Sequence, residues 1–433
     1  MKLEEQKRLM EDHGYAADLN LLYGEHTLAA KRYAAACDAF GKLFGKEREV
    51  RFFSAPGRTE VGGNHTDHQH GCVLAGSVNL DVIAVVSPNN EKVVRIQSAG
   101  FDMDEIDLSV LEPVQAEEGR AAALIRGMCA AFQSAGLKIG GFDAYTTSNV
   151  LKGSGLSSSA AFEVLVGVIL NHLYNGGEDR AVQIAKMAQY AENVYFGKPC
   201  GLMDQTASSV GGFTAIDFAD PENPVIEKIA FDPADRGHRL CIVNTGGNHA
   251  DLTQDYADIT NEMRSVSAIF GKTVLRDVEE ESFLLSIATV REQCGDRAVL
   301  RALHFFEENR RAVEEKKALQ DGDFERFLKL VRASGRSSYM YLQNVYSPSA
   351  PGEQGLSLAL ALCERILGER GAFRVHGGGF AGTIQAFVPE ELLERFINEM
   401  EVVFGNESCH VLNIRPAGGF ALSAGQPSQG EIC

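Results

Sequence analysis

The residues best suited to chemistry gather in a glycine-rich loop near the start of the chain. Residues 55–68 (APGRTEVGGNHTDH) set an arginine, an aspartate and two histidines among glycines and a proline. Arg58, His65, Asp67 and His68 offer far more hydrogen-bonding capacity than a turn requires. A loop of this composition suits a ligand with many hydroxyl groups. The same spacing of histidine and aspartate could hold a metal ion, although no third well-placed ligand accompanies the set.

A second glycine-rich segment, residues 152–161 (KGSGLSSSAA), runs directly into helix-forming residues. Gly153 and Gly155 let the backbone approach a ligand closely, and the serines can cap a helix whose free N–H groups face outward. A helix start of this kind binds anions, and phosphate is the obvious occupant. The segment is neither a Walker A loop nor a Rossmann fingerprint. The alternative is an ordinary serine-capped helix after a flexible turn, and spacing alone does not choose between the two.

Two later segments also carry candidate residues. Residues 200–205 (CGLMDQ) place Asp204 after a proline and a glycine and beside an apolar pair. A carboxylate held partly desolvated there could act as a general base, but a helix N-cap is the more ordinary role for such an aspartate. Residues 375–383 (VHGGGFAGT) form a glycine run between two expected strands. This run could be a hairpin turn or a second ligand-facing loop.

The elements that must position these segments are helices and strands in mixed order. Hydrophobic periodicity predicts helices over residues 3–45, 120–133, 159–173, 180–196, 300–334 and 389–403. Runs of β-branched residues predict that 82–86 and 92–96 are paired strands, and strands restart near 213. We therefore expect three parts. They are a helical extension over residues 1–48 that packs on the N-terminal lobe, an N-terminal lobe over 49–215 and a C-terminal lobe over 216–433.

Composition narrows the classes of partner. The chain has 433 residues, 45% of them hydrophobic, which suffices for two or three domains with buried cores. A formal net charge of −18 repels the phosphates of nucleic acid and the anionic face of a membrane, so neither is an expected partner. Nine scattered cysteines without a CxxC pair indicate reduced thiols. The N-terminus lacks the pattern of a signal peptide, and the sequence predicts a cytoplasmic protein.

In their order along the chain, these segments resemble the three signatures of the GHMP kinases. The signatures are a Pro-Gly-Arg sugar loop, a Gly-x-Gly-Leu-Ser-Ser-Ser-Ala phosphate loop and a late Gly-x-Gly-Phe-x-Gly loop. Residues 55–74 are further similar to the galactokinase branch. The resemblance implies a two-lobed α+β fold with the active site in the cleft between the N- and C-terminal lobes. It also implies ATP-dependent phosphorylation of the anomeric C1 hydroxyl of galactose, with ATP and Mg²⁺ as cofactors, by a monomer or weak oligomer.

The resemblance assigns roles to individual residues. It implies that Asp204 accepts the proton of the C1 hydroxyl and that Arg58 orients Asp204 and stabilises the transition state. Sugar contacts are implied for Asn64, His65, Asp67, Gly201 and Tyr256. ATP binding is implied for Gly153, Ser154, Gly155, Leu156, Ser157, Ser158, Ser159 and Ala160. Ser159 and Glu192 match positions that bind magnesium.

One departure from the family pattern bears on the substrate. The galactokinase signature has a glutamate in the sugar pocket where this chain has Asn64. An amide can hydrogen-bond a hydroxyl, but it does not repel a carboxylate. A kinase for galacturonate or another C6-modified galactose is therefore an alternative, which the similarity of Asp67-His68-Gln69 to plant galacturonate kinases supports. A non-catalytic sugar and ATP sensor is a second alternative, and the intact residues 157–160 and Asp204 argue against it.

Overall fold

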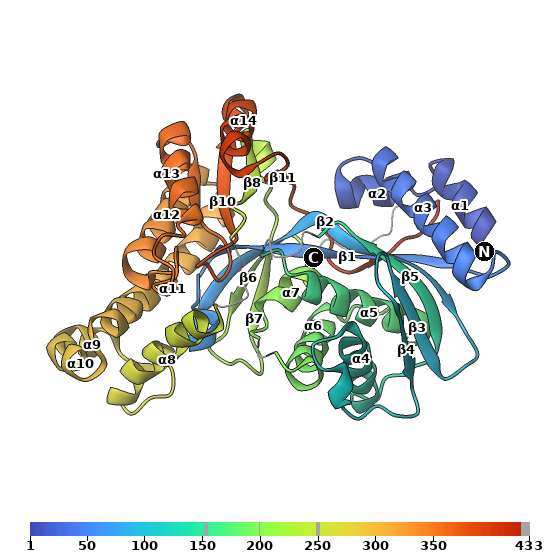
Figure 1. The fold of residues 1–433 in the computed structure, drawn as a ribbon, viewed down its shortest axis with the longest axis horizontal. Helices are drawn as coiled ribbons and strands as arrows, with labels where there is room; N and C mark the ends of the chain where they lie inside the picture. Colours follow the sequence, from blue (N-terminus) through green and yellow to red (C-terminus); the bar gives the residue numbers. More distant parts are fainter. Residues whose placement is uncertain (151–154, 199, 248–251, 426–433) are drawn as a thin grey trace.

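The computed structural model of the chain describes residues 1–150, 155–198, 200–247 and 252–425. Within these ranges it contains one large and one small β-sheet, each covered by helices, which is the α+β organisation that the sequence predicts. Figure 1 shows the two sheets in different halves of the molecule, with the N-terminal helices at one end of the large sheet. None of the helices in the described ranges has both the length and the apolar composition needed to cross a bilayer.

The N-terminal extension is helical, as its periodicity predicts. It consists of α1 (Leu3–Glu11), α2 (Ala16–Tyr23) and α3 (Thr27–Phe44). Their buried aromatic side chains, including Tyr33 and Phe40, share a hydrophobic cluster with Phe52 and Ile83 of the large sheet. Arg32 adds polar contacts, because its Nη2 donates to the carbonyls of Asp81 and Thr147, each at 2.9 Å. The extension is thus attached to two neighbouring strands of the large sheet.

The large sheet has the strand order β12-β1-β2-β5-β3-β4, with β6 and β7 continuing from β2. Its strands are β1 (Arg51–Gly62), β2 (Cys72–Pro88), β3 (Val93–Ser98), β4 (Met103–Asp107), β5 (Phe142–Ser148), β6 (Phe213–Asp217), β7 (Val225–Ile229) and β12 (Phe420–Ala421). The predicted pairing of residues 82–86 with 92–96 is wrong, because β5 lies between β2 and β3. Local patterns identify these strands but cannot show that a later segment is inserted between them.

The sheet also differs from the expected division into lobes at residue 216. Strands β6 and β7 both belong to the large sheet, and the chain returns to it near its end as β12. The first strand of the small sheet, β8, begins only at His238. The boundary expected from the restart of strand patterns therefore lies inside the large sheet. A strand's pattern shows its periodicity, not the sheet that it joins.

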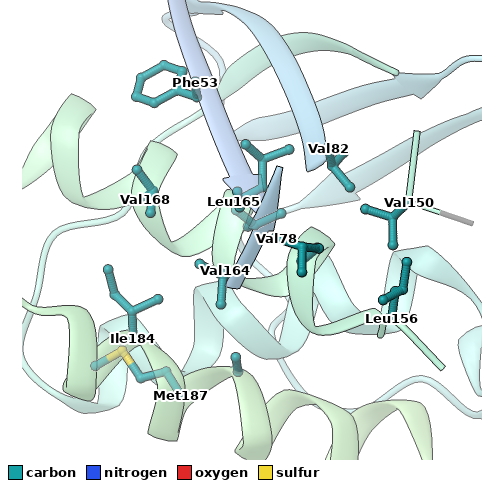
Figure 2. Packing of buried hydrophobic residues seen from close by; sticks show 14 of the residues in the cluster. Phe53, Val78, Val82, Val150, Leu156, Val164, Leu165, Val168, Ile184 and Met187 are labelled. Carbon is teal, nitrogen blue, oxygen red and sulfur yellow. The ribbon is translucent and has the colours of Figure 1, made fainter. Parts of the chain in front are cut away.

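Helices cover the large sheet on the face that carries the phosphate loop. They are α4 (Ala121–Ser134), α5 (Ser158–Tyr174), α6 (Ala181–Tyr190), the π-helical segment Ala191–Phe196 and α7 (Met203–Val210). Figure 2 shows Val164 and Val168 of α5 packed in the same cluster as Phe53 of the sheet and Ile184 of α6. Gly167 allows α5 and α6 to approach closely, because a Cβ there would lie 2.6 Å from Ile184. This packing fixes where α5 begins.

The small sheet has the order β11-β8-β10-β9 and is antiparallel throughout. Its strands are β8 (His238–Asn244), β9 (Ala372–Val375), β10 (Thr383–Pro389) and β11 (Cys409–Leu412). The helices of this half are α8 (Thr253–Ile269), α9 (Glu280–Leu285), α10 (Ile287–Cys294), α11 (Asp296–Gln320), α12 (Phe324–Ser337), α13 (Gly355–Leu367) and α14 (Leu393–Phe404), with a π-helical segment at Ser338–Leu342. Because α11 contacts both α12 and β2, it joins the two halves.

Candidate active site

A paired arginine and aspartate form the centre of the candidate site. Arg58 on β1 donates from Nε to Asp204 Oδ1 and from Nη2 to Asp204 Oδ2, both at 2.7 Å. Asp204 is the second residue of α7, whose N-cap is Leu202, so the N-cap alternative for Asp204 is wrong. Burial alone would raise the pKa of Asp204, but the charge of Arg58 and a hydrogen bond from Ser157 outweigh it and lower that pKa. The carboxylate is therefore ionised at neutral pH.

The end of the phosphate loop lies directly against this pair. Gly155 accepts a hydrogen bond from Arg58 Nη1, and the carbonyl of Leu156 accepts from the Arg58 amide at 3.0 Å. Ser157 has a φ of 55° and precedes α5, yet its side chain does not cap the helix. Because none of the described side chains is found to cap α5, its first N–H groups could bind an anion.

The remaining residues expected to bind ATP have different surroundings. The side chains of Leu156 and Ala160 are fully buried in the hydrophobic core, so only their backbone atoms could face a nucleotide. Ser158 and Ser159 occupy the first turn of α5. Gly153 and Ser154 lie outside the described residues. The loop's described end is held by Gly57, where a Cβ would lie 2.9 Å from the Leu156 carbonyl and 3.2 Å from Val150.

The two residues expected to bind magnesium lie together beside the pair. Ser159 Oγ donates to Glu192 Oε1 at 3.1 Å, and the Glu192 carboxylate is almost fully buried. Hydroxyl and carboxylate oxygens are the ligands that Mg²⁺ prefers, so these residues fit the ion. No group of three or more acidic, histidine or cysteine side chains that could hold a metal occurs in the described part of the chain. Phosphate oxygens and water would have to supply the other ligands.

Sequence reasoning missed how Gln205 organises this corner. Its Nε2 lies 2.7 Å from Glu192 Oε2 and 3.3 Å from Glu163 Oε2, and the amide is fully buried. Gln205 directly follows the candidate base Asp204 and hydrogen-bonds the candidate magnesium ligand Glu192. The only available signal was its position beside Asp204 in the CGLMDQ segment.

Two of the residues expected to bind sugar, His65 and Tyr256, lie against the late glycine loop. His65 Nε2 lies 2.9 Å from the carbonyl of Gly378, and burial together with nearby His68 lowers the pKa of His65 to about 4. The imidazole of His65 is therefore neutral at pH 7. The Tyr256 hydroxyl, carried by α8, donates to the carbonyl of Gly379 at 3.0 Å. The glycine run connects the antiparallel strands β9 and β10, as the hairpin interpretation predicts, and it contacts both residues. That it faces a ligand stays a prediction.

Asp67 and Gly201 lie in contact with each other. A Cβ at Gly201 would lie 2.4 Å from Asp67 Oδ2, so the carboxylate can occupy this position only beside a glycine. Gly201 belongs to the segment that leads into α7, two residues before the helix begins. The structure thus brings a residue of the first glycine-rich loop against the segment that carries Asp204.

Asn64 has a different environment from the other residues expected to bind sugar. Its Nδ2 donates to Glu60 Oε1 and to the carbonyl of Gly377, each at 2.8 Å. Its Oδ1 accepts from Asn344 Nδ2 at 2.9 Å and from Ser338 Oγ at 3.2 Å. The side chain is fully buried, and these four bonds use all the capacity of an amide. In this structure Asn64 has no donor or acceptor left for the C6 group of a sugar.

Asn64 is part of a buried polar network that joins the sugar loop to the C-terminal half. Glu60 pairs with Arg374 Nη2 at 2.8 Å, and both side chains are nearly inaccessible to water. Glu308 on α11 accepts from the amides of Gly63 and Asn64 at 3.1 and 3.3 Å. Burial would raise the pKa of Glu308, but Arg311 and other nearby cations lower it to about 2. Sequence reasoning missed this network because its members are far apart in the chain.

Three loops in this order, together with an Arg–Asp pair beside the start of a helix, are the features of a small-molecule kinase of the GHMP class. Residues 123–212 match the GHMP kinases N terminal domain, and residues 38–88 match the galactokinase galactose-binding signature. The galactokinase of Streptomyces coelicolor is 32% identical over 387 residues, covering 88% of this chain and 96% of that protein. The chain belongs to the galactokinase family.

Solved structures agree with the fold. The galactokinase of Lactococcus lactis, crystallised with galactose, superposes with a TM-score of 0.76 at 24% identity, covering 90% of this chain and 99% of that chain. The mevalonate kinase of Methanococcus jannaschii superposes with a TM-score of 0.59 at 15% identity, covering 84% and 98%. These similarities establish the two-lobed GHMP kinase fold.

Proposed function

We propose that the protein phosphorylates galactose at its anomeric C1 hydroxyl, using ATP and producing galactose 1-phosphate and ADP. The observation that carries this proposal is the bidentate Arg58–Asp204 pair at the described end of the phosphate loop. A sugar hydroxyl is a weak nucleophile, and the transferring phosphoryl group carries distributed negative charge. The site supplies a carboxylate for the proton and a guanidinium for the charge within one pair of side chains.

In the proposed mechanism, Asp204 accepts the proton of the C1 hydroxyl as that oxygen attacks the γ-phosphorus of ATP. Arg58 holds the carboxylate by two hydrogen bonds, so a proton acceptor of fixed orientation faces the sugar. The start of α5 binds the polyphosphate through its free N–H groups. Ser159 and Glu192 would hold Mg²⁺, which neutralises charge on the phosphates when bound.

The sugar is proposed to lie between the first loop and the late glycine loop. Asp67 and His65 from the first loop, Gly201, and Tyr256 on α8 would form its walls. Asn64 would not contact the sugar, because all donors and acceptors of its amide are already hydrogen-bonded. It would instead support the site by holding the carbonyl of Gly377. This placement removes the direct contact on which the galacturonate alternative was based. We therefore favour galactose over a C6-modified relative.

A substrate comparison tests the proposal. Purified protein would be assayed for ADP release with galactose, galacturonate, arabinose and N-acetylgalactosamine, and the product's phosphate position would be determined by ³¹P NMR. We expect the highest kcat/KM with galactose and a 1-phosphate product. A higher kcat/KM with galacturonate would show that galacturonate, rather than galactose, is the substrate. Binding of sugar and ATP without ADP release would instead indicate a non-catalytic sensor.

A further inference from the structure

Lys198 contacts the carboxylate of Glu192, which is proposed to bind magnesium. Its Nζ lies 3.3 Å from Glu192 Oε1, the atom that also accepts the hydrogen bond of Ser159 Oγ. The backbone amide of Lys198 donates to the Glu192 carbonyl at 3.2 Å, which anchors the base of the side chain beside Glu192. Lys198 directly follows Gly197, where the π-helical segment ends in a left-handed conformation.

The two members of this ion pair differ strongly in their exposure to water. The side chain of Glu192 is 2% exposed, whereas that of Lys198 is 63% exposed. A buried carboxylate needs a counter-charge, and Lys198 supplies one. Because most of its side chain lies in water, Lys198 can leave Glu192 by rotating its own bonds, without disturbing the core.

A magnesium ion would compete with Lys198 for this position. Mg²⁺ binds oxygen ligands at about 2.1 Å and keeps a near-octahedral shell, so an ion on Glu192 Oε1 would lie close to the ammonium group. Two cations at that separation repel each other. Lys198 has no other side-chain hydrogen bond or ion pair within the described ranges. An anion that arrives together with the metal would therefore be its next partner.

The position of Lys198 indicates which anion this is, and this step rests on the proposed function. ATP bound at the start of α5 would bring its phosphates to Ser159, and Ser159 and Lys198 share one oxygen of Glu192. We propose that Lys198 is a phosphate-binding residue that exchanges Glu192 for the polyphosphate of ATP when Mg²⁺ binds. Lys198 would thus neutralise Glu192 before Mg²⁺ and ATP bind, and phosphate charge after they bind.

Nucleotide binding tests this exchange without relying on turnover. The chain has no tryptophan, so energy transfer from tryptophan is absent and a mant-labelled AMPPNP reports binding through its own fluorescence. In Lys198→Met the Kd for the Mg²⁺ complex of this analogue should rise about 10-fold or more, as expected for the loss of a charge-assisted hydrogen bond. Lys198→Arg should retain most of the affinity. Lys329→Met is a matched control, because Lys329 also pairs with a glutamate, Glu325, but on an exposed helix surface.

A second measurement separates the exchange from a fixed structural ion pair. Without nucleotide, the Mg²⁺ concentration needed to raise the melting temperature should be equal or lower in Lys198→Met, because a competing cation has been removed. An unchanged analogue Kd in Lys198→Met would overturn the proposal, as would a weaker Mg²⁺ effect. If the wild-type protein itself fails to bind the analogue or to release ADP, the proposed function fails. Wild-type turnover with normal binding by Lys198→Met refutes the role of Lys198 alone.

Discussion

Two arginine–carboxylate pairs begin two residues apart on β1, and they differ in almost everything except their chemistry. Arg58 pairs with Asp204 at 2.7 Å, and Glu60 pairs with Arg374 at 2.8 Å. Asp204 has 27% of its side chain exposed, whereas Glu60 has 6% and Arg374 none. An accessible pair can exchange a proton with a ligand. A sealed pair can only fix the segments that carry it.

The partners of each pair lead to the same contrast. Arg58 donates a further bond to the carbonyl of Gly155, and Asp204 accepts one from Ser157, so both bonds lead to the phosphate loop. The Glu60 pair is instead completed by Asn64 and joins β1 to β9 in the C-terminal half. We infer that the first pair performs the chemistry and that the second holds the sugar loop against the other lobe. Burial, rather than residue type, separates the two roles.

The largest expected effect is at the accessible pair. Asp204→Asn removes the proton acceptor while keeping its shape, so kcat should fall by about 10²–10⁴-fold or more. Steady-state ADP release measures the loss, and thermal melting should show a folded protein. Asp217→Asn serves as a control, because Asp217 also pairs with an arginine, Arg276, but at the surface of β6. A near-normal rate in Asp204→Asn would refute its assignment as the base.

Substituting each arginine by methionine tests the contrast between the two pairs directly. Arg374→Met leaves Glu60 buried without its counter-charge and should lower the free energy of unfolding by about 3–5 kcal/mol. Arg58→Met should cost less stability, because water can reach Asp204, but it should lower kcat/KM far more. Urea unfolding and ADP release of both variants give the comparison. Equal destabilisation by the two substitutions would show that burial does not separate the pairs.

A substitution at Asn64 tests whether the buried network around Glu60 and Arg374 also contacts the sugar. Asn64→Leu leaves the carbonyl of Gly377 and the amide of Asn344 without this partner and should cost about 1–3 kcal/mol for each buried group left unpaired. If Asn64 acts only as a support, kcat/KM for galactose and for galacturonate should fall by similar factors. A change in their ratio would restore the direct contact with C6 that the sequence predicts.

What could be predicted from the sequence follows from how local each feature is. Arg58 and Ser159 lie in segments whose glycine and serine content is unusual, so these segments stood out. The roles predicted for Asp204 and Glu192 came instead from the resemblance to the GHMP kinases. The direction of Asn64 was not visible. The pairing of β1 with β2 shifts register between Glu60 and Gly62, and such an irregularity changes the direction of the side chains that follow.

Partners distant in sequence were beyond local patterns altogether. Arg374 follows Glu60 by more than three hundred residues, and no periodicity relates the two. The insertion of β5 between β2 and β3 has the same cause, because it depends on a pairing between distant segments. Residue types and the family resemblance therefore predicted residues that lie together in the structure, whereas the network that surrounds them required the fold.

The last prediction concerns the pH dependence of stability. It depends on Glu315, a fully buried carboxyl group beside the Glu60–Arg374 network. Glu315 lies over Gly62, where a Cβ would come within 1.7 Å of it, and neither of its oxygens has a hydrogen-bond partner in the described part of the protein. Burial and the charge of Glu308 raise the pKa of Glu315 well above its usual value. For an acid with a raised folded-state pKa, its contribution to stability is complete below the unfolded-state pKa and is lost as pH rises toward the folded-state pKa.

Glu315→Gln cannot ionise, so its stability relative to the wild type should increase as pH rises from about 5 to 8, by at most about 1.4 kcal/mol per pH unit. Urea unfolding of both proteins across this range measures the trend. Glu315→Leu should show the same trend with a different offset, because it also lacks the carboxyl group. Parallel curves for variant and wild type would mean that Glu315 ionises freely in the folded protein. The region beneath the sugar loop would then be open to water, and the contrast between the two arginine pairs would not hold.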